Sequence, residues 1–234
     1  MTRRNDILLD VKGMTIGHRD RALYSGADIR LREGDCVMLC GANGSGKTTL
    51  LKMLAEMKDS QGGEIVMIPS RIPKVQGFTL REFVRISCYR QSDLGGRLSS
   101  GQEARIDGAL ASLGLEELSS RDISTLSDGE FQKGSIASAL VRRASVMLLD
   151  EPTAFLDAEN RIGVLKTLRA LCETPDDRGF RPAIMFSTHD LHDGLAVCNK
   201  VMALGSDGKV RTGHDNLREI IKTIFKDHSN DNQI

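Results

Sequence analysis

Tryptophan is absent from this 234-residue sequence, and aromatic residues of all kinds make up only 4% of it. An excess of charge is absent too, since Lys+Arg and Asp+Glu number 32 each. Domains that bind nucleic acid are commonly basic and use aromatic side chains to stack on bases. The composition therefore gives no indication of a nucleic-acid partner, and we expect none.

Long apolar runs are also missing. Segments such as 146–149 and 183–186 are short, whereas a helix that crosses a membrane needs about 20 apolar residues. Residues 1–6 are largely polar and lead into a strand-like stretch rather than the apolar core of a signal peptide. We therefore expect a cytoplasmic chain without a membrane-spanning segment of its own.

Cysteine is sparse, with five residues and no C-x-x-C pair. We interpret them as small, buried or half-buried residues of a reducing compartment, and we expect no metal site among them. They are Cys36, Cys40, Cys88, Cys172 and Cys198. With 40% hydrophobic and 27% charged residues, the composition is that of a soluble globular protein, and the length suits one large domain.

Strand-like and helix-like segments alternate along most of the chain. Residues 7–34 are typical of short strands and turns, and residues 77–120 of a mostly helical region. The other expected elements are a strand at 36–40, helices at 48–58 and 131–143, a strand at 146–149, a helix at 159–172, a strand at 183–187, a helix at 191–197 and a strand at 200–204. This alternation predicts an α/β fold with a largely parallel sheet.

A glycine-rich loop follows the apolar run 36–40. Residues 41–48, Gly-Ala-Asn-Gly-Ser-Gly-Lys-Thr, match the pattern G-x-x-x-x-G-K-[ST]. Because the loop follows a predicted strand and opens a predicted helix, its N–H groups and the helix dipole would face phosphate oxygens. Lys47 would neutralise the β- and γ-phosphates, and the Thr48 hydroxyl would bind Mg²⁺. The predicted ATP site comprises Gly41, Ala42, Asn43, Gly44, Ser45, Gly46, Lys47, Thr48 and Thr49.

Polar residues stand where two later strands are expected to end. Asp150 and Glu151 directly follow the run 146–149, and His189 follows the run 183–187. Parallel strands present their functional groups at their carboxyl ends, so these residues should lie near the glycine loop. Asp150 would then hold Mg²⁺, Glu151 would polarise a water molecule, and His189 would contact the γ-phosphate.

Residues 126–130, Leu-Ser-Asp-Gly-Glu, precede the predicted helix 131–143. Ser127 and Glu130 have the S-x-x-E spacing of a capping box, in which each side chain bonds to the backbone N–H of the other residue. A helix N-terminus with a serine is also a place where phosphate binds. Both interpretations stay open, because they are compatible if the phosphate comes from another subunit.

The order of these motifs resembles the ATPase domain of ABC transporters. The glycine loop, residues 126–130, the pair 150–151, the stretch 155–157 and His189 follow one another as in that family, over residues from about 10 to about 213. The resemblance implies a P-loop NTPase core with a largely parallel sheet, a small N-terminal antiparallel β subdomain and a helical subdomain at about 77–125. It implies one ATPase domain over residues 1–226 and a polar tail at 227–234.

The same resemblance implies a head-to-tail dimer with two ATP molecules, each between the glycine loop of one subunit and residues 126–130 of the other. Asp157 would lie in the loop that crosses the dimer, and His18 would replace the aromatic residue that stacks on adenine. The implied catalytic residues are Lys47, Glu151 as general base and His189 as switch histidine; Ser127, Asp128, Gly129 and Glu130 would contact the partner's ATP, and Thr48 and Asp150 would hold Mg²⁺.

Within the family, the chain is most similar to the ATPases of iron-siderophore, haem and cobalamin importers. The supporting segments are 78–84, 96–99, 127–130 and 152–157. The resemblance implies a peripheral subunit on the cytoplasmic face of the plasma membrane. It would energise import through a separate permease that is supplied by a substrate-binding protein. The cargo stays open, because the permease and the binding protein select it.

Three residues depart from the usual family pattern. Ser70 stands where the family has a glutamine, with Gln76 as an alternative that lies too close to the next helix. Asp128 replaces a glycine and would bring negative charge near a partner's γ-phosphate unless it points away, and His18 replaces a tyrosine. Two further interpretations therefore stay open: a soluble ABC ATPase with a role outside transport, and a degenerate module that binds ATP but hardly turns over.

Overall fold

Six strands form the central sheet of the computed structural model, which describes residues 7–18, 21–57, 63–88, 98–154, 156–214 and 219. They are β3 (Cys36–Gly41), β4 (Ile65–Ile68), β5 (Val146–Leu149), β6 (Ala183–Ser187), β7 (Lys200–Leu204) and β8 (Val210–Gly213). Their order is β4-β5-β6-β3-β7-β8, and only β8 is antiparallel to its neighbour. The predicted α/β fold with a largely parallel sheet is confirmed.

A second, two-stranded sheet precedes it in the chain. Strands β1 (Ile7–His18) and β2 (Arg21–Arg32) pair antiparallel, as the expected N-terminal β subdomain requires. The prediction of short strands was wrong, because each strand runs for 12 residues. Several register shifts let this two-stranded ribbon (β1 and β2, called the ribbon below) bend without ending. Gly13 and Gly26 take positive φ angles of 65° and 72° within it.

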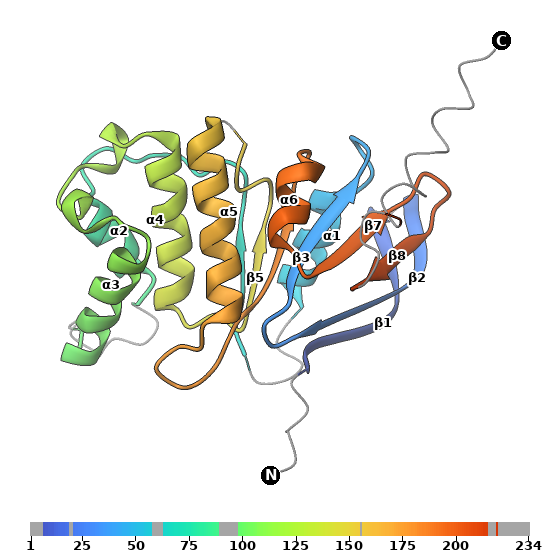
Figure 1. Ribbon diagram of the computed structural model, residues 1–234, viewed down its shortest axis with the longest axis horizontal. Coiled ribbons are helices and arrows are strands. Elements are labelled where there is room, and N and C mark those ends of the chain that lie inside the picture. Colours follow the sequence, from blue (N-terminus) through green and yellow to red (C-terminus); the bar gives the residue numbers. More distant parts are fainter. Residues whose placement is uncertain are drawn as a thin grey trace.

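Helices cover the two faces of the large sheet unequally. They are α1 (Lys47–Glu56), α2 (Leu80–Ile86), α3 (Ser100–Ser112), α4 (Asp128–Val141), α5 (Ala158–Glu173) and α6 (Leu191–Val197). Strand β3 shows the division: Cys36, Met38 and Cys40 belong to the core on the α4–α6 side, whereas Val37 and Leu39 face α1 and the ribbon. In Figure 1, α4 and α5 lie side by side, with α2 and α3 beyond α4.

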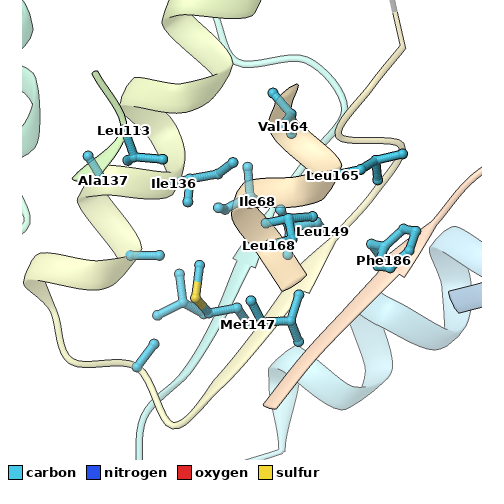
Figure 2. Close-up of a cluster of buried hydrophobic side chains, with 14 of the residues drawn as sticks. Ile68, Leu113, Ile136, Ala137, Met147, Leu149, Val164, Leu165, Leu168 and Phe186 are labelled. Atoms are coloured by element: carbon cyan, nitrogen blue, oxygen red, sulfur yellow. The ribbon is translucent and has the colours of Figure 1, made fainter. Parts of the chain in front are cut away.

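Helices α4 and α5 pack on the sheet through apolar side chains. Figure 2 shows Ile136 and Ala137 of α4 and Val164, Leu165 and Leu168 of α5 gathered over the sheet. The strand residues that they meet include Ile68, Met147, Leu149 and Phe186, all at most 3% exposed. Each such side chain contributes about 1.5–3 kcal/mol of hydrophobic stabilisation, so this packing holds both helices against the sheet.

Helix α4 is shifted from its predicted span of 131–143. It begins at Asp128, because Ser127 caps it, and it ends at Val141. Two residues later Arg143 has a φ of 58°, a left-handed conformation that stops the helix. Helix α3, within the region predicted to be mostly helical, begins in the same way, with Ser99 and Gln102 in a capping box.

Backbone hydrogen bonds join the start of α2 to the segment that precedes α4. The Ile123 N–H donates to the Phe78 carbonyl at 2.9 Å, and the Leu80 N–H donates to the Arg121 carbonyl at 2.9 Å. Helices α2 and α3 pack against α4 rather than against the sheet. The boundary of 77–125 for a helical subdomain stays a prediction, as do the domain over 1–226 and the tail at 227–234, whose residues lie outside the described ranges.

One buried ion pair joins the ribbon to the large sheet. The Lys200 Nζ atom lies 3.0 Å from Asp35 Oδ2 and donates to the Arg30 carbonyl at 2.5 Å. The Lys200 and Asp35 side chains are only 5% and 9% exposed, so water screens the pair little. All five cysteines are buried and free, as we expected from their scatter.

Candidate functional site

Four neighbouring strands deliver polar residues to one edge of the sheet. The order β4-β5-β6-β3 is parallel throughout, so the carboxyl ends of these strands lie together. Ser70 follows β4, Asp150 and Glu151 follow β5, His189 follows β6, and the glycine loop follows β3. The structure thus brings together the side chains that we predicted to converge at strand ends.

The glycine loop wraps around the side chain of its own lysine. Lys47 Nζ donates to the carbonyls of Gly41 at 2.9 Å and Ala42 at 3.1 Å. Gly46 has a φ of 93°, a backbone conformation that favours glycine, and a Cβ there would lie 2.8 Å from Leu23 Cδ1 of β2. Burial lowers the pKa of Lys47, while Glu151, Cys40 and Asp150 act in the opposite direction and favour the cation.

The loop has donors suited to a polyphosphate. The Ser45 hydroxyl is buried and has no hydrogen-bond partner within the described residues. Helix α1 begins here without a side-chain cap, so the N–H groups of its first turn lack the partner that a cap would supply. Together with the Lys47 ammonium, these groups fit the phosphates of a nucleotide.

Asp150 is held by two hydroxyl groups. Thr48 Oγ1 donates to the Asp150 carboxylate, at 2.9 Å from Oδ2 and 3.1 Å from Oδ1. Ser187 Oγ donates to Asp150 Oδ1 at 2.9 Å. A carboxylate next to a threonine hydroxyl is a donor set of hard oxygens, which fits Mg²⁺ bound jointly with phosphate. No motif pointed to Ser187; the available signal was a polar residue at the last position of an otherwise apolar strand.

Glu151 and His189 face each other beside this pair. The His189 Nε2 and Glu151 Oε1 atoms lie 2.5 Å apart, and both side chains are partly exposed. Glu151 has a φ of 49°, a conformation that non-glycine residues rarely adopt and that is typical of functional sites. Its N–H donates to Ser187 Oγ at 2.8 Å, so Ser187 orients both Asp150 and Glu151.

Residues 126–130, which we call the signature turn, contain a complete capping box. The Glu130 N–H donates to Ser127 Oγ at 3.3 Å, and the Ser127 N–H donates to Glu130 Oε2 at 2.7 Å. That second bond lowers the pKa of the Glu130 carboxyl. The capping interpretation is therefore confirmed, and it leaves a phosphate role open. Asp128 does not stand alone, since Lys74 pairs with it.

The signature turn packs against the start of α5. A Cβ on Gly129 would lie 3.3 Å from Leu156 Cδ2 and 3.5 Å from Asn160 Cγ, so the two segments approach closely. Asp157 caps α5 by accepting from the Asn160 N–H at 2.8 Å. The signature turn and the start of α5, where the predicted dimer-loop residue Asp157 lies, are thus neighbours in the structure.

The remaining predicted residues are Ser70, His18 and parts of the segments 96–99 and 152–157. Ser70 is half-buried and follows the end of β4 by two residues. The side chain of His18, and the residues Gly96, Arg97 and Phe155, lie outside the described part of the chain. Of the helices in the described ranges, none combines the length and the apolarity that crossing a membrane requires.

Comparison with known proteins identifies the family. A family model described as ABC transporter matches residues 24–154, more than half of the chain. The chain belongs to the ABC transporter family. It is 36% identical over 188 residues to the aliphatic sulfonates import ATP-binding protein SsuB 2 of Pseudomonas savastanoi pv. phaseolicola, an alignment that covers 80% of this chain and 67% of that protein.

Other members of the ABC family match over similar lengths. The petrobactin import ATP-binding protein FpuC of Bacillus anthracis is 28% identical over 216 residues, which are 84% of this chain and 78% of that protein. The solved structure of an inward-facing, metal-chelate-type ABC transporter has a TM-score of 0.79 at 24% identity and covers 94% of this chain and 89% of that one. The dimeric cassette MJ0796 bound to ADP and phosphate has a TM-score of 0.68 at 21% identity, covering 88% and 97%. The predicted family, fold and ATPase class are confirmed.

Proposed function

We propose that this ABC ATPase binds and hydrolyses MgATP to drive import through a separate membrane permease. The observation that carries the proposal is the Glu151–His189 contact of 2.5 Å beside the Thr48–Asp150 pair, at the strand edge that also bears the glycine loop. This arrangement supplies a carboxylate base, a histidine and a site for phosphate and metal in one place.

The residues divide the chemistry between them. Ser45, Lys47 and the N–H groups of the loop hold the phosphates, with Lys47 leaving its two loop carbonyls to do so. Thr48 and Asp150 would hold Mg²⁺, which neutralises charge on the phosphate oxygens. Glu151 accepts a proton from the attacking water, and His189 fixes the Glu151 carboxylate and reaches the γ-phosphate.

The signature turn completes the site of a second copy in this proposal. Its Ser127 hydroxyl and the N-terminus of α4 would face the partner's γ-phosphate, and Asp157 would lie where the two copies cross. The dimeric cassette bound to ADP and phosphate, which shares this fold, supports a dimer. A homodimer is the simplest assembly, since one chain contains both halves of the site.

The importing role rests on the relatives. SsuB 2 and FpuC are both named import ATP-binding proteins, which supports a role in import. The partner that we propose is a membrane permease, with the ATPase on the cytoplasmic face of the membrane. Val75, Phe78 and Ile86 are large apolar side chains that are 53%, 40% and 47% exposed around α2. We propose that this surface receives the permease.

A metal chelate such as an iron siderophore, haem or cobalamin is the cargo that we propose. The petrobactin protein and the likeness to the metal-chelate-type transporter support it. Aliphatic sulfonates are the second candidate, because relatives with that cargo are more identical to this chain. A substrate-binding protein would deliver either one to the permease.

Co-purification tests the importing role. The tagged chain, expressed in its own host, should retain a membrane permease, and the complex in vesicles should hydrolyse ATP faster when a loaded binding protein is added. Vesicles loaded with MgATP and supplied from outside with the binding protein and either a siderophore–iron complex or a sulfonate then identify the cargo by uptake. Repeated recovery of soluble partners without a permease would favour the ABC ATPase with a role outside transport.

A further inference from the structure

Three groups of one turn converge on the Lys74 ammonium. Lys74 Nζ lies 2.7 Å from the Leu126 carbonyl oxygen and 2.7 Å from Asp128 Oδ1. It also lies 5.7 Å from the centroid of the Phe131 ring, within reach of a cation–π contact. Lys74 belongs to the segment between β4 and α2, so a residue four positions after Ser70 is fastened to the signature turn.

Stability does not account for this arrangement. The Asp128 side chain is 66% exposed and Lys74 is 24% exposed, and ion pairs at such positions contribute little to folding. The helix start does not need the pair either, because Ser127 and Glu130 already form a complete capping box. The contact therefore calls for a reason other than holding α4 in place.

The charge of Asp128 supplies that reason, provided that the proposed function is correct. In the dimer, the signature turn would meet the triphosphate of the other copy's nucleotide, and Asp128 would add a negative charge to that contact. Like charges at an interface that loses its water are strongly unfavourable. The Lys74 ammonium cancels this charge, and its 2.7 Å bond fixes the direction in which the carboxylate points.

We propose that Lys74 is a positioning residue that neutralises Asp128, so that the signature turn can accept the triphosphate of a second copy's nucleotide. The family glycine at position 128 would make such a cation unnecessary. The lysine and the aspartate thus act as one unit that replaces a neutral residue. Because Lys74 follows Ser70 closely, the same bond ties the β4 strand end to the turn.

ATP-dependent dimerisation of the full chain with Glu151→Gln tests this role, since we expect that substitution to prevent hydrolysis. The variants K74M, D128N and K74M/D128N are made in this background, and the MgATP concentration for half-maximal dimer is measured by light scattering. K74M should raise that concentration by about tenfold, because Asp128 is left without its counter-charge. The double variant should recover most of the loss, because D128N removes the charge that K74M leaves unpaired.

Controls separate this effect from damage to the fold. K209M makes the same change at an exposed lysine between β7 and β8, at the end of the molecule away from α2–α4, and should dimerise like the background. K74M should keep the thermal midpoint of the background to within a few degrees. If Lys74 merely tethered the turn, D128N would not compensate for K74M and the double variant would recover nothing.

The outcomes distinguish this inference from the proposed function. A normal ATP-dependent dimer in K74M, or a double variant no better than K74M alone, overturns the role of Lys74 and leaves the ATPase proposal intact. Absence of an ATP-dependent dimer in the Glu151→Gln background overturns the proposed head-to-tail dimer and this inference with it. Recovery in the double variant supports both.

Discussion

The Ser187 hydroxyl donates to Asp150 Oδ1 at 2.9 Å and accepts from the N–H of the next residue, Glu151, at 2.8 Å. One fully buried side chain therefore orients the proposed metal ligand and the backbone of the proposed base. Partners of this kind fix the direction of a ligand's lone pairs and tune its affinity for metal. Ser187 belongs to β6, so the neighbouring strand sets the geometry of residues after β5.

We predict that Ser187→Ala weakens Mg²⁺ binding more than it weakens the fold. Loss of the hydroxyl frees the Asp150 carboxylate and leaves the Glu151 N–H without its partner. The Mg²⁺ concentration for half-maximal ATPase activity should rise by about tenfold, the smaller end of the range for such partners. Ser135→Ala is the matched control, since Ser135 is also buried but bonds only within α4. Equal Mg²⁺ dependence of the two variants would remove Ser187 from the site.

A second prediction concerns Glu151 itself. Glu151→Gln keeps the size of the side chain but cannot take a proton, so ATP hydrolysis should fall by about 100-fold or more. Nucleotide binding should persist, because Lys47 and the glycine loop are unchanged, and the variant should accumulate as a dimer in MgATP. Glu117→Gln makes the same chemical change at an exposed carboxylate in the 3₁₀ turn Glu116–Leu118 and should hydrolyse normally. Hydrolysis by E151Q at the rate of E117Q would exclude Glu151 as the base.

The strand-end site was predictable because its signals are local. Each of the runs before Gly41, Asp150 and His189 is apolar and short, and parallel pairing brings the polar residues after these runs to one edge. Ser187 escaped notice because its signal, one polar residue at the end of an apolar strand, belongs to no recognised motif. Lys74 escaped because its partner Asp128 lies 54 residues away, and contacts at that separation are set by how helices dock.

The length of the strands in the ribbon could not be predicted from the sequence. Residues 7–34 contain turn-forming glycines, which predict short strands, yet β1 and β2 continue through them. Gly13 and Gly26 supply bends within a paired ribbon, and their positive φ angles are compatible with bulges as well as with turns. Local sequence could not choose between the two, because the choice depends on pairing with a strand elsewhere.

Acid should weaken the start of α4. Hydrogen bonding to Ser127 lowers the pKa of Glu130 from its ordinary value of 4.5 in the folded chain. A carboxylate with a lowered pKa stabilises the fold above its unfolded-state pKa, and the contribution is lost as pH falls through the folded-state value. The urea midpoint of Glu130→Gln should therefore approach that of the parent as pH falls below about 4.5. A constant difference between the two proteins from pH 7 to pH 3 would contradict this linkage.

The buried Lys200–Asp35 pair should be the most sensitive point between the ribbon and the sheet. Lys200→Met leaves Asp35 and the Arg30 carbonyl without their cation in a site with little water, so it should cost about 3–5 kcal/mol. Asp35→Asn should cost a comparable amount, and the double variant should cost less than the sum of the two. Arg30→Met is the control, because its pair with Asp10 is 44% and 26% exposed and should cost below about 1 kcal/mol. Urea unfolding measures all four, and strictly additive losses at positions 35 and 200 would mean that the two side chains act independently.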